Sequence, residues 1–138
     1  MNIYESAENY LETILMLRNK LGPVRSIDIV NELSFSKPSV SVAMKKLRES
    51  GHVLVDEEGH ITLTESGLAV AETMYERHLL LSECLIALGV DEEVAKDDAC
   101  RIEHVISQQT FEKMREHVNR HKEEDARGLR PLDPRQRD

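Results

Sequence analysis

The most reactive segment of the sequence is Cys100-Arg101-Ile102-Glu103-His104, where a thiol, a carboxylate and an imidazole occur at positions i, i+3 and i+4. On a helix these three positions share one sector. Thiolate, carboxylate and imidazole groups are all ligands of first-row transition metals. A single sulfur among nitrogen and oxygen donors favours Fe(II), Co(II), Ni(II) or Zn(II) over Mn(II), because manganese prefers carboxylate and carbonyl ligands.

Two further segments could complete a coordination sphere. Asn9 and Glu12 are i, i+3 neighbours and would project together from a helix, opposite its apolar stripe. His78 lies in a third segment that also has helical character. Each residue alone is more often ordinary surface or core, so only the combination is informative. The predicted ligands of a divalent transition metal are Asn9, Glu12, His78, Cys100, Glu103 and His104.

Hydrophobic periodicity and helix-capping residues predict the elements that would hold these donors. Ser26 and Ser36 are the expected N-caps of the second and third helices, and Asp91 is expected to cap the fifth. Two β-prone runs, 52–55 and 60–64, are joined by Asp56-Glu57-Glu58-Gly59 and predict a hairpin. The predicted helices cover residues 5–20, 26–33, 37–49, 65–88, 91–107 and 110–122.

This order of elements predicts a mainly α fold with two domains. Helices, a tight turn and a hairpin within residues 1–70 form a winged helix-turn-helix, which is a DNA-binding unit. Residues 71–124 form an all-helical domain for metal binding and dimerisation, because their apolar helices need a partner surface. Residues 125–138, which contain Gly and Pro among alternating charges, are expected to be a flexible tail.

The third helix carries a surface suited to DNA. Val40, Ala43, Met44 and Leu47 share an inward face, and the opposite face could enter a major groove about 12 Å wide. This segment is locally basic although the chain is acidic, and the acidic hairpin tip would repel phosphates. The residues predicted to contact bases or phosphates are Ser36, Lys37, Pro38, Ser39, Ser41, Val42, Lys45 and Lys46.

The composition limits the other classes of function. The 138 residues are 40% hydrophobic and 32% charged, with a net charge of −8, which argues against coating nucleic acid by bulk charge. No apolar run is long enough to cross a bilayer, and no secretory signal is evident. The two cysteines form no disulfide framework, so we expect a cytoplasmic protein with reduced thiols and no membrane partner.

In ordered series, these motifs resemble the DtxR/MntR family of iron- and manganese-dependent transcriptional repressors. The matching segments are 8–12, 34–51, 75–78, 89–93 and 99–104. The resemblance implies a winged-helix domain followed by a helical dimerisation domain, without the SH3-like domain of some iron-type members. It also implies a homodimer that binds palindromic operator DNA when Fe(II) or Mn(II) is bound and represses metal-uptake genes, with no organic cofactor.

The predicted metal ligands match the two branches of the family to different extents. Cys100 matches the iron branch, whereas Glu12 matches the manganese branch. Glu103 and His104 match both branches, as does His78, although His78 belongs to a different metal site in each. Asn9 stands where the iron branch has methionine and the manganese branch has aspartate. Iron is therefore the favoured metal, on the strength of the thiolate, and manganese is the second.

The residues in the second metal site of the iron branch are replaced here by Ser82 and Lys96, which are not acidic or imidazole ligands. Three other interpretations remain open. One is a winged-helix regulator that does not respond to metal, and another is a metal-buffering protein without DNA binding. The third, an enzyme using a Cys100–His104 pair, lacks any sign of an orienting group or oxyanion donors, so we predict a protein that is not an enzyme.

Overall fold

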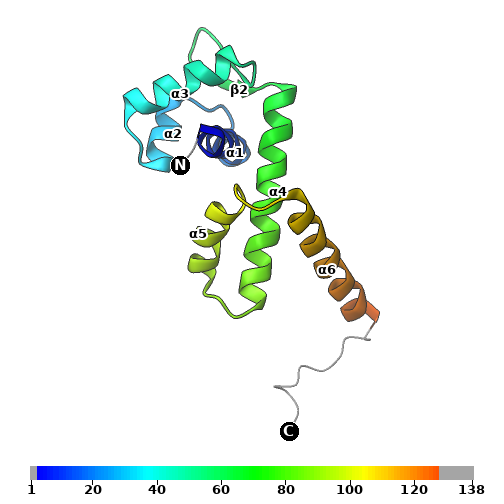
Figure 1. Ribbon diagram of the computed structural model, residues 1–138. Coiled ribbons are helices and arrows are strands. Elements are labelled where there is room, and N and C mark those ends of the chain that lie inside the picture. The colour runs from blue at the N-terminus through cyan, green and yellow to red at the C-terminus, as the bar shows by residue number, and fades with distance from the viewer. Residues whose placement is uncertain (1–2, 128–138) are drawn as a thin grey trace. The chain divides into compact units, whose positions relative to one another are not determined.

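The computed structural model describes residues 3–127, which form a mainly helical fold with one two-stranded sheet (Figure 1). Their contacts divide the chain into two compact units, Met1–Leu79 and Leu80–Asp138. The elements, in chain order, are α1 (Ile3–Leu21), α2 (Ser26–Leu33), α3 (Lys37–Glu49), β1 (Val53–Val55), β2 (Ile61–Leu63), α4 (Glu65–Ala87), α5 (Glu92–Ile102) and α6 (Gln108–Arg127). The predicted fold class, a winged helix-turn-helix followed by helices, is confirmed.

The core of the first unit is built on α1, which contacts α2, α3 and β2. Every residue from position 10 to position 15 of α1 is buried, so the middle of this helix has no face in solvent. The core is completed by Ile29 of α2 and Val40 of α3, neither of which has any measurable exposure. At the end of α1, however, Leu21 is 54% exposed, because the apolar stripe predicted from the sequence leaves the core there.

The turn before α3 fixes the direction of that helix. Ser34 adopts a left-handed conformation with φ 57°, and Ser36 then caps α3 by accepting a hydrogen bond from the Ser39 amide at 3.2 Å. The cap predicted for α2 was wrong. Arg25 is its N-cap, and Ser26 is the first helical residue; the Arg25 amide donates to the Asp28 carboxylate at 2.9 Å, which satisfies the backbone there.

The hairpin after α3 is the wing. Its strands are antiparallel, in a register that pairs Val53 with Leu63, and Val53 and Ile61 point into the core. The bridge between Val24 and Ile61 extends the pairing to the segment after α1. The wing is therefore held to the core by its inner face, and its tip is left in solvent.

In the second unit, α5 ends earlier than predicted, at Ile102 rather than near residue 107. Ser107 is the reason, because its hydroxyl accepts a hydrogen bond from the Thr110 amide at 3.1 Å and so caps α6. A capping residue has non-helical dihedrals, so the chain must leave α5 before it. Helix α6 runs on to Arg127, which makes part of the predicted tail helical; residues 128–138 lie outside the described residues.

None of the described helices combines the length and hydropathy that a membrane crossing requires.

Gly67 provides a test of how the wing is held against α4. A methyl group there would collide with the backbone carbonyl of His52. Gly→Ala in a helix usually stabilises by about 1 kcal/mol, whereas we expect Gly67→Ala to lower the free energy of unfolding by about 1–3 kcal/mol through overpacking. Urea denaturation measures this change. Glu72→Ala, at an exposed site on the same helix, is the control, and a more stable Gly67→Ala protein would contradict the packing.

Candidate metal centre and DNA-binding face

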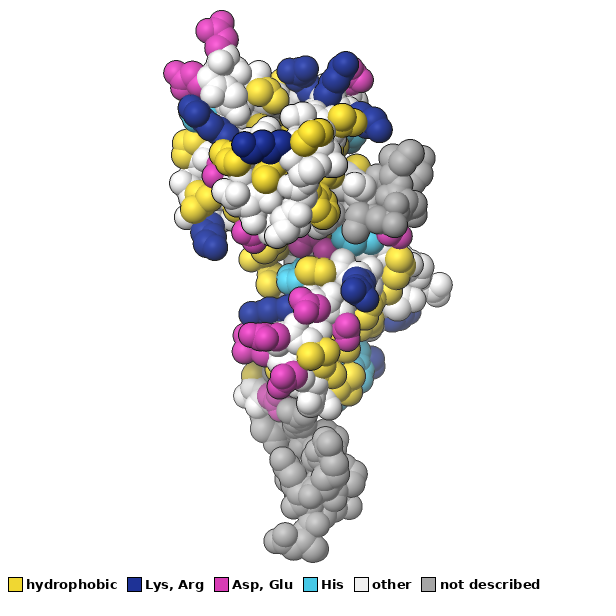
Figure 2. All heavy atoms as spheres, turned by 90° about the vertical axis from the view of Figure 1, so that its left-hand side faces the viewer, with side chains coloured by type: hydrophobic (Ala, Val, Ile, Leu, Met, Phe, Trp, Pro, Cys, Tyr) yellow, Lys and Arg dark blue, Asp and Glu magenta, His cyan; other side chains and the backbone are white. Residues whose placement is uncertain are grey.

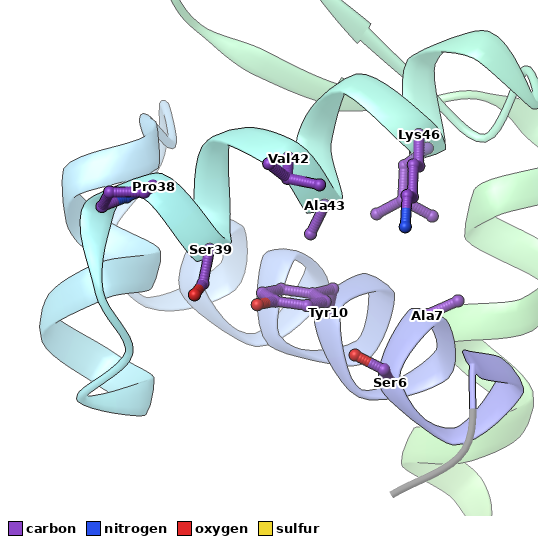
Figure 3. Close-up of a pocket in the computed structure, with 9 residues that line it drawn as sticks. Ser6, Ala7, Tyr10, Pro38, Ser39, Val42, Ala43 and Lys46 are labelled. Carbon is purple, nitrogen blue, oxygen red and sulfur yellow. The ribbon is translucent and has the colours of Figure 1, made fainter.

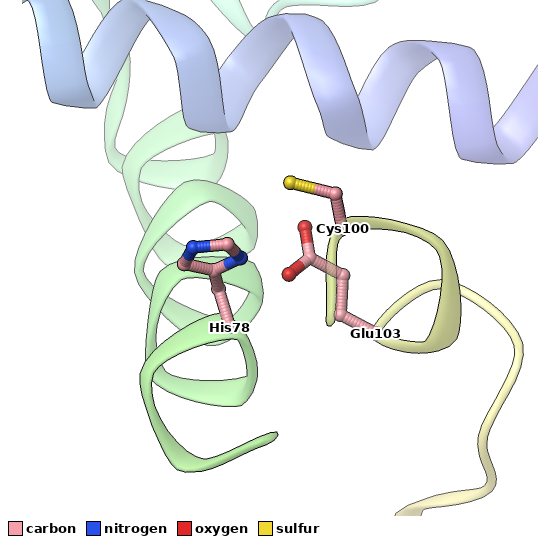
Figure 4. Close-up of side chains that lie close together, drawn as sticks. All are labelled: His78, Cys100 and Glu103. Atoms are coloured by element: carbon pink, nitrogen blue, oxygen red, sulfur yellow. The ribbon is translucent and has the colours of Figure 1, made fainter. Parts of the chain in front are cut away.

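The end of α5 presents three of the predicted metal ligands. Glu103 keeps helical dihedrals as the C-cap, and its amide donates to the Ala99 carbonyl at 3.0 Å. The chain therefore keeps its helical register from Cys100 to Glu103, and both side chains project from the same part of the chain (Figure 4). His104 lies in the turn beyond the helix rather than on it, which corrects the prediction that all three ligands share one helix.

Glu103 and His104 form a buried acid–imidazole pair. Their side chains are only 1% and 3% exposed, and Glu103 Oε1 lies 3.4 Å from His104 Nε2. Cys100, in contrast, is exposed. The second unit thus brings together a carboxylate and an imidazole, with a thiol one turn earlier on the helix.

The first unit holds the other predicted ligands on two helices. Asn9 is half-buried on α1, and Glu12 is buried with 3% exposure, so Glu12 is not the solvated surface residue that such a glutamate usually is. His78 is half-buried on α4, where Figure 4 draws its imidazole. A glutamate buried on a helix without a solvent face is a costly feature, which an apolar residue would avoid.

The chemistry of this donor set fits a divalent transition metal. The set combines hard oxygen donors, borderline imidazoles and a soft thiol, and a buried carboxylate is stabilised by a nearby positive charge. The positions of a second site offer nothing comparable. Ser82 is a buried hydroxyl, and Lys96 is an exposed cation that pairs with Glu92 at 3.0 Å.

The face of α3 that is predicted to contact DNA is exposed. Its inner face is buried as expected, with Val40, Met44 and Leu47 each at most 5% exposed. Ala43 is half-buried at the edge. The exposed positions are Ser36, Lys37, Pro38, Ser39, Ser41, Val42, Lys45 and Lys46. Figure 2 shows Lys and Arg side chains spread over the part of the surface that the first unit forms, with acidic side chains projecting at its tip.

A hollow that the sequence did not reveal lies between α1 and α3, with a volume of about 500 Å³ (Figure 3). Ser39, Val42 and Lys46 border it from α3, and Tyr10 forms part of its wall from α1. The Tyr10 ring packs edge-on against Phe35 with centroids 5.8 Å apart, and burial raises the pKa of its hydroxyl. Tyr10 therefore stays a neutral phenol beside a surface that we expect to approach phosphates.

The wing tip is less uniformly acidic than its sequence suggested. His60 Nδ1 lies 3.4 Å from a carboxylate oxygen of Asp56 and 3.5 Å from one of Glu58. This arrangement was not predicted from the sequence, although a histidine two residues after Glu58 and four after Asp56 was a visible signal for it. When protonated, His60 offsets part of the negative charge at the tip.

Taken together, the fold and the donor set define a winged-helix unit joined to a helical unit whose side chains include groups of the types that bind metals. Two family models match the chain: the iron dependent repressor N-terminal DNA binding domain over residues 2–61, and the iron dependent repressor metal binding and dimerisation domain over residues 64–131. The chain belongs to this family of metal-dependent transcriptional regulators, the DtxR/MntR family, as its motifs predicted.

Individual relatives agree with this assignment. The HTH-type transcriptional regulator MntR of Bacillus subtilis is 32% identical over 122 residues, which are 88% of this chain and 86% of that protein. An HTH-type transcriptional regulator of Methanocaldococcus jannaschii is 31% identical over 113 residues, 80% of this chain and 90% of that one. The solved structure of the manganese regulator SloR is similar, with a TM-score of 0.74 and 28% identity; the match covers 82% of this chain and 53% of SloR.

The wing tip also provides a pH-dependent test. Amide hydrogen bonds from His60 and then Glu58, together with the charge of His60, hold the pKa of Asp56 below its ordinary value. A carboxyl with a lowered pKa stabilises its turn above its ordinary pKa, and this contribution disappears as the pH falls through the lowered value. NMR titration should therefore show Asp56 ionising below the ordinary value of an aspartate, and a pKa at or above that ordinary value would contradict the turn.

Proposed function

We propose that the protein is an Fe(II)-responsive homodimeric repressor that binds palindromic operator DNA when its metal site is filled. The observation that carries the proposal is the buried Glu103–His104 pair, one turn after Cys100, in a chain whose α3 exposes a basic face. A metal-controlled regulator needs both a set of metal donors and a DNA-binding face. An enzyme or a metal buffer would need only the metal donors.

The ligands we propose are the side chains of Asn9, Glu12, His78, Cys100, Glu103 and His104. When bound, the metal supplies a divalent charge that several buried donors can share. Carboxylate, imidazole and amide groups would bind it through oxygen and nitrogen, and the thiol would bind as a thiolate after losing its proton. The thiol supports Fe(II) ahead of Mn(II), although the similar structure named above is that of a manganese regulator.

Metal binding would regulate DNA binding by restricting the movement of the winged-helix units. The donors of α1 belong to the same unit as α3, and those at the end of α5 belong to the other unit. An ion shared between them would limit how α3 moves relative to the second unit and, in a dimer, relative to the α3 of the other copy. Two such helices must lie about 34 Å apart to enter successive major grooves.

A coupling free energy of about 1–3 kcal/mol between metal binding and DNA binding is enough for such control. Because coupling between two binding sites is reciprocal, operator DNA should tighten metal binding by the same factor. We place the protein in the cytoplasm, where its operator and the metal pool would both be accessible, and we propose metal-uptake genes as its targets.

The metal switch is tested by anaerobic DNA binding with Fe(II), Mn(II), Zn(II) or a chelator. We expect the metal to strengthen specific binding by about 5- to 150-fold, and Glu103→Ala and Cys100→Ala to remove most of this gain because a ligand is lost. Glu93→Ala, which removes an exposed carboxylate from the same helix, should retain it. Specific binding that is equal in metal and in chelator, and equal in both ligand variants, would favour a regulator not controlled by metal.

Lys37 provides a separate test of the DNA-binding face. A cation at the start of a helix is unfavourable to the helix dipole, so Lys37→Ala should leave the fold as stable as before or more stable. If Lys37 contacts a phosphate, the variant should bind all DNA sequences more weakly, and the slope of log K against log salt should fall by about 1. Lys20→Ala, at the end of α1, is the control; an unchanged salt slope in Lys37→Ala would exclude the contact.

A further inference from the structure

The wing tip holds a group of three metal-binding side chains that the proposed metal centre does not use. Asp56, Glu58 and His60 each offer one ligand atom, and these atoms all lie within 4.8 Å of one another. The three residues belong to the first unit and sit on one turn between β1 and β2. The tip is therefore a separate cluster with its own chemistry.

The turn fixes the first of the two carboxylates. Asp56 Oδ1 accepts hydrogen bonds from the amides of Glu58 and His60, each at 2.9 Å. The other oxygen, Oδ2, lies 3.4 Å from Nδ1 of the His60 imidazole. The hydrogen bond from the His60 amide is the main reason that the pKa of Asp56 lies below its ordinary value, so this carboxyl is ionised near neutral pH.

The same imidazole nitrogen faces the second carboxylate, since Glu58 Oε2 lies 3.5 Å from it. Both distances exceed the about 2.7–3.2 Å of an ordinary N–H···O hydrogen bond. Ligands about 2.1 Å from a tetrahedral zinc ion, in contrast, lie about 3.4 Å from one another. His60 Nδ1 is thus separated from each oxygen by the distance expected between two ligands of one ion.

We propose that Asp56, Glu58 and His60 bind a divalent ion of borderline hardness, such as Zn(II), Co(II) or Ni(II), at the wing tip. Imidazole suits these ions, whereas Mg(II) and Ca(II) prefer oxygen ligands. Both carboxylates are exposed, so water can complete the coordination sphere. None of the three ligands belongs to the centre proposed above, and the site does not depend on that centre.

An ion at the tip would also change how the wing meets DNA, a consequence that rests on the proposed function. The tip carries three carboxylates, those of Asp56, Glu57 and Glu58, which repel phosphates. A divalent ion would offset two of these three negative charges. The wing could then approach the DNA backbone, which its acidic tip otherwise opposes.

Residue-resolved NMR on the full chain tests the site separately from the metal centre. We expect Zn(II) to shift the Nδ1 resonance of His60 and Mg(II) to leave it unchanged. Loss of an outer-shell partner alone weakens metal binding by about 10- to 100-fold, so Asp56→Asn and Glu58→Gln should each raise the Zn(II) concentration needed by at least about tenfold. Asparagine can still accept the two amide hydrogen bonds, so Asp56→Asn keeps the turn.

Glu57→Gln is the matched control, because it removes the same charge from the tip but belongs to no group of converging ligands. If Glu57→Gln weakens the Zn(II) response as much as Glu58→Gln does, general attraction of cations to an acidic turn explains the binding and the site is overturned. A His60 Nδ1 resonance that Zn(II) leaves unchanged would overturn it as well, because the imidazole would then be only an ion-pair partner of the two acids.

The effect on DNA is measured with His60→Gln, which removes a ligand and no carboxylate. In saturating Zn(II), we expect the unmodified chain to bind DNA of random sequence about five- to tenfold more tightly than His60→Gln at about 0.1 M salt, if the tip gains one phosphate contact. The difference should disappear in chelator, and equal binding in Zn(II) would overturn this effect. Failure of the proposed function is distinguishable, because metal would then not control operator binding while Zn(II) still shifted the His60 resonance.

Discussion

The burial of two carboxylates, Glu12 in the first unit and Glu103 in the second, is the constraint on which the rest of the account depends. They are 3% and 1% exposed. An ionised carboxylate removed from water is unfavourable by several kcal/mol unless positive charge and hydrogen bonds compensate it. The imidazole of His104 supplies part of this compensation to Glu103 when it is protonated. A divalent cation would supply more, which explains how folding and metal binding could be linked in this chain.

The DNA-binding unit is built so that such a link can matter. Helix α1 carries Glu12 and also packs against α3, whose exposed face is basic. Leu11 of α1 and Val40 of α3 belong to one buried core, so under the proposed function a restraint applied to α1 would reach α3 through that core. The acidic composition of the whole chain does not oppose this function, because α3 itself exposes Lys37, Lys45 and Lys46.

Local signals in the sequence predicted much of the fold. Helix α3 has the predicted bounds because Ser36 caps it and Gly51 follows it, and the wing forms around the predicted turn. The end of α5 could not be predicted from periodicity alone, because Ile102 and Ile106 continue the helical pattern while Ser107 starts the next helix. The burial of Glu12 also could not be predicted from the sequence, because it results from contacts made by a whole helix rather than from neighbours in sequence.

The central claim, that donors of both units bind one ion, is tested most directly by a double-mutant cycle on metal affinity, with Glu12→Gln and Glu103→Gln measured singly and together by calorimetry on the full chain. If both carboxylates hold the same ion, each change should weaken binding by at least about tenfold, and the two effects should be strongly non-additive, as expected for groups in one site. Unchanged affinity in Glu12→Gln, or two losses that simply add, would show that the two side chains do not share an ion.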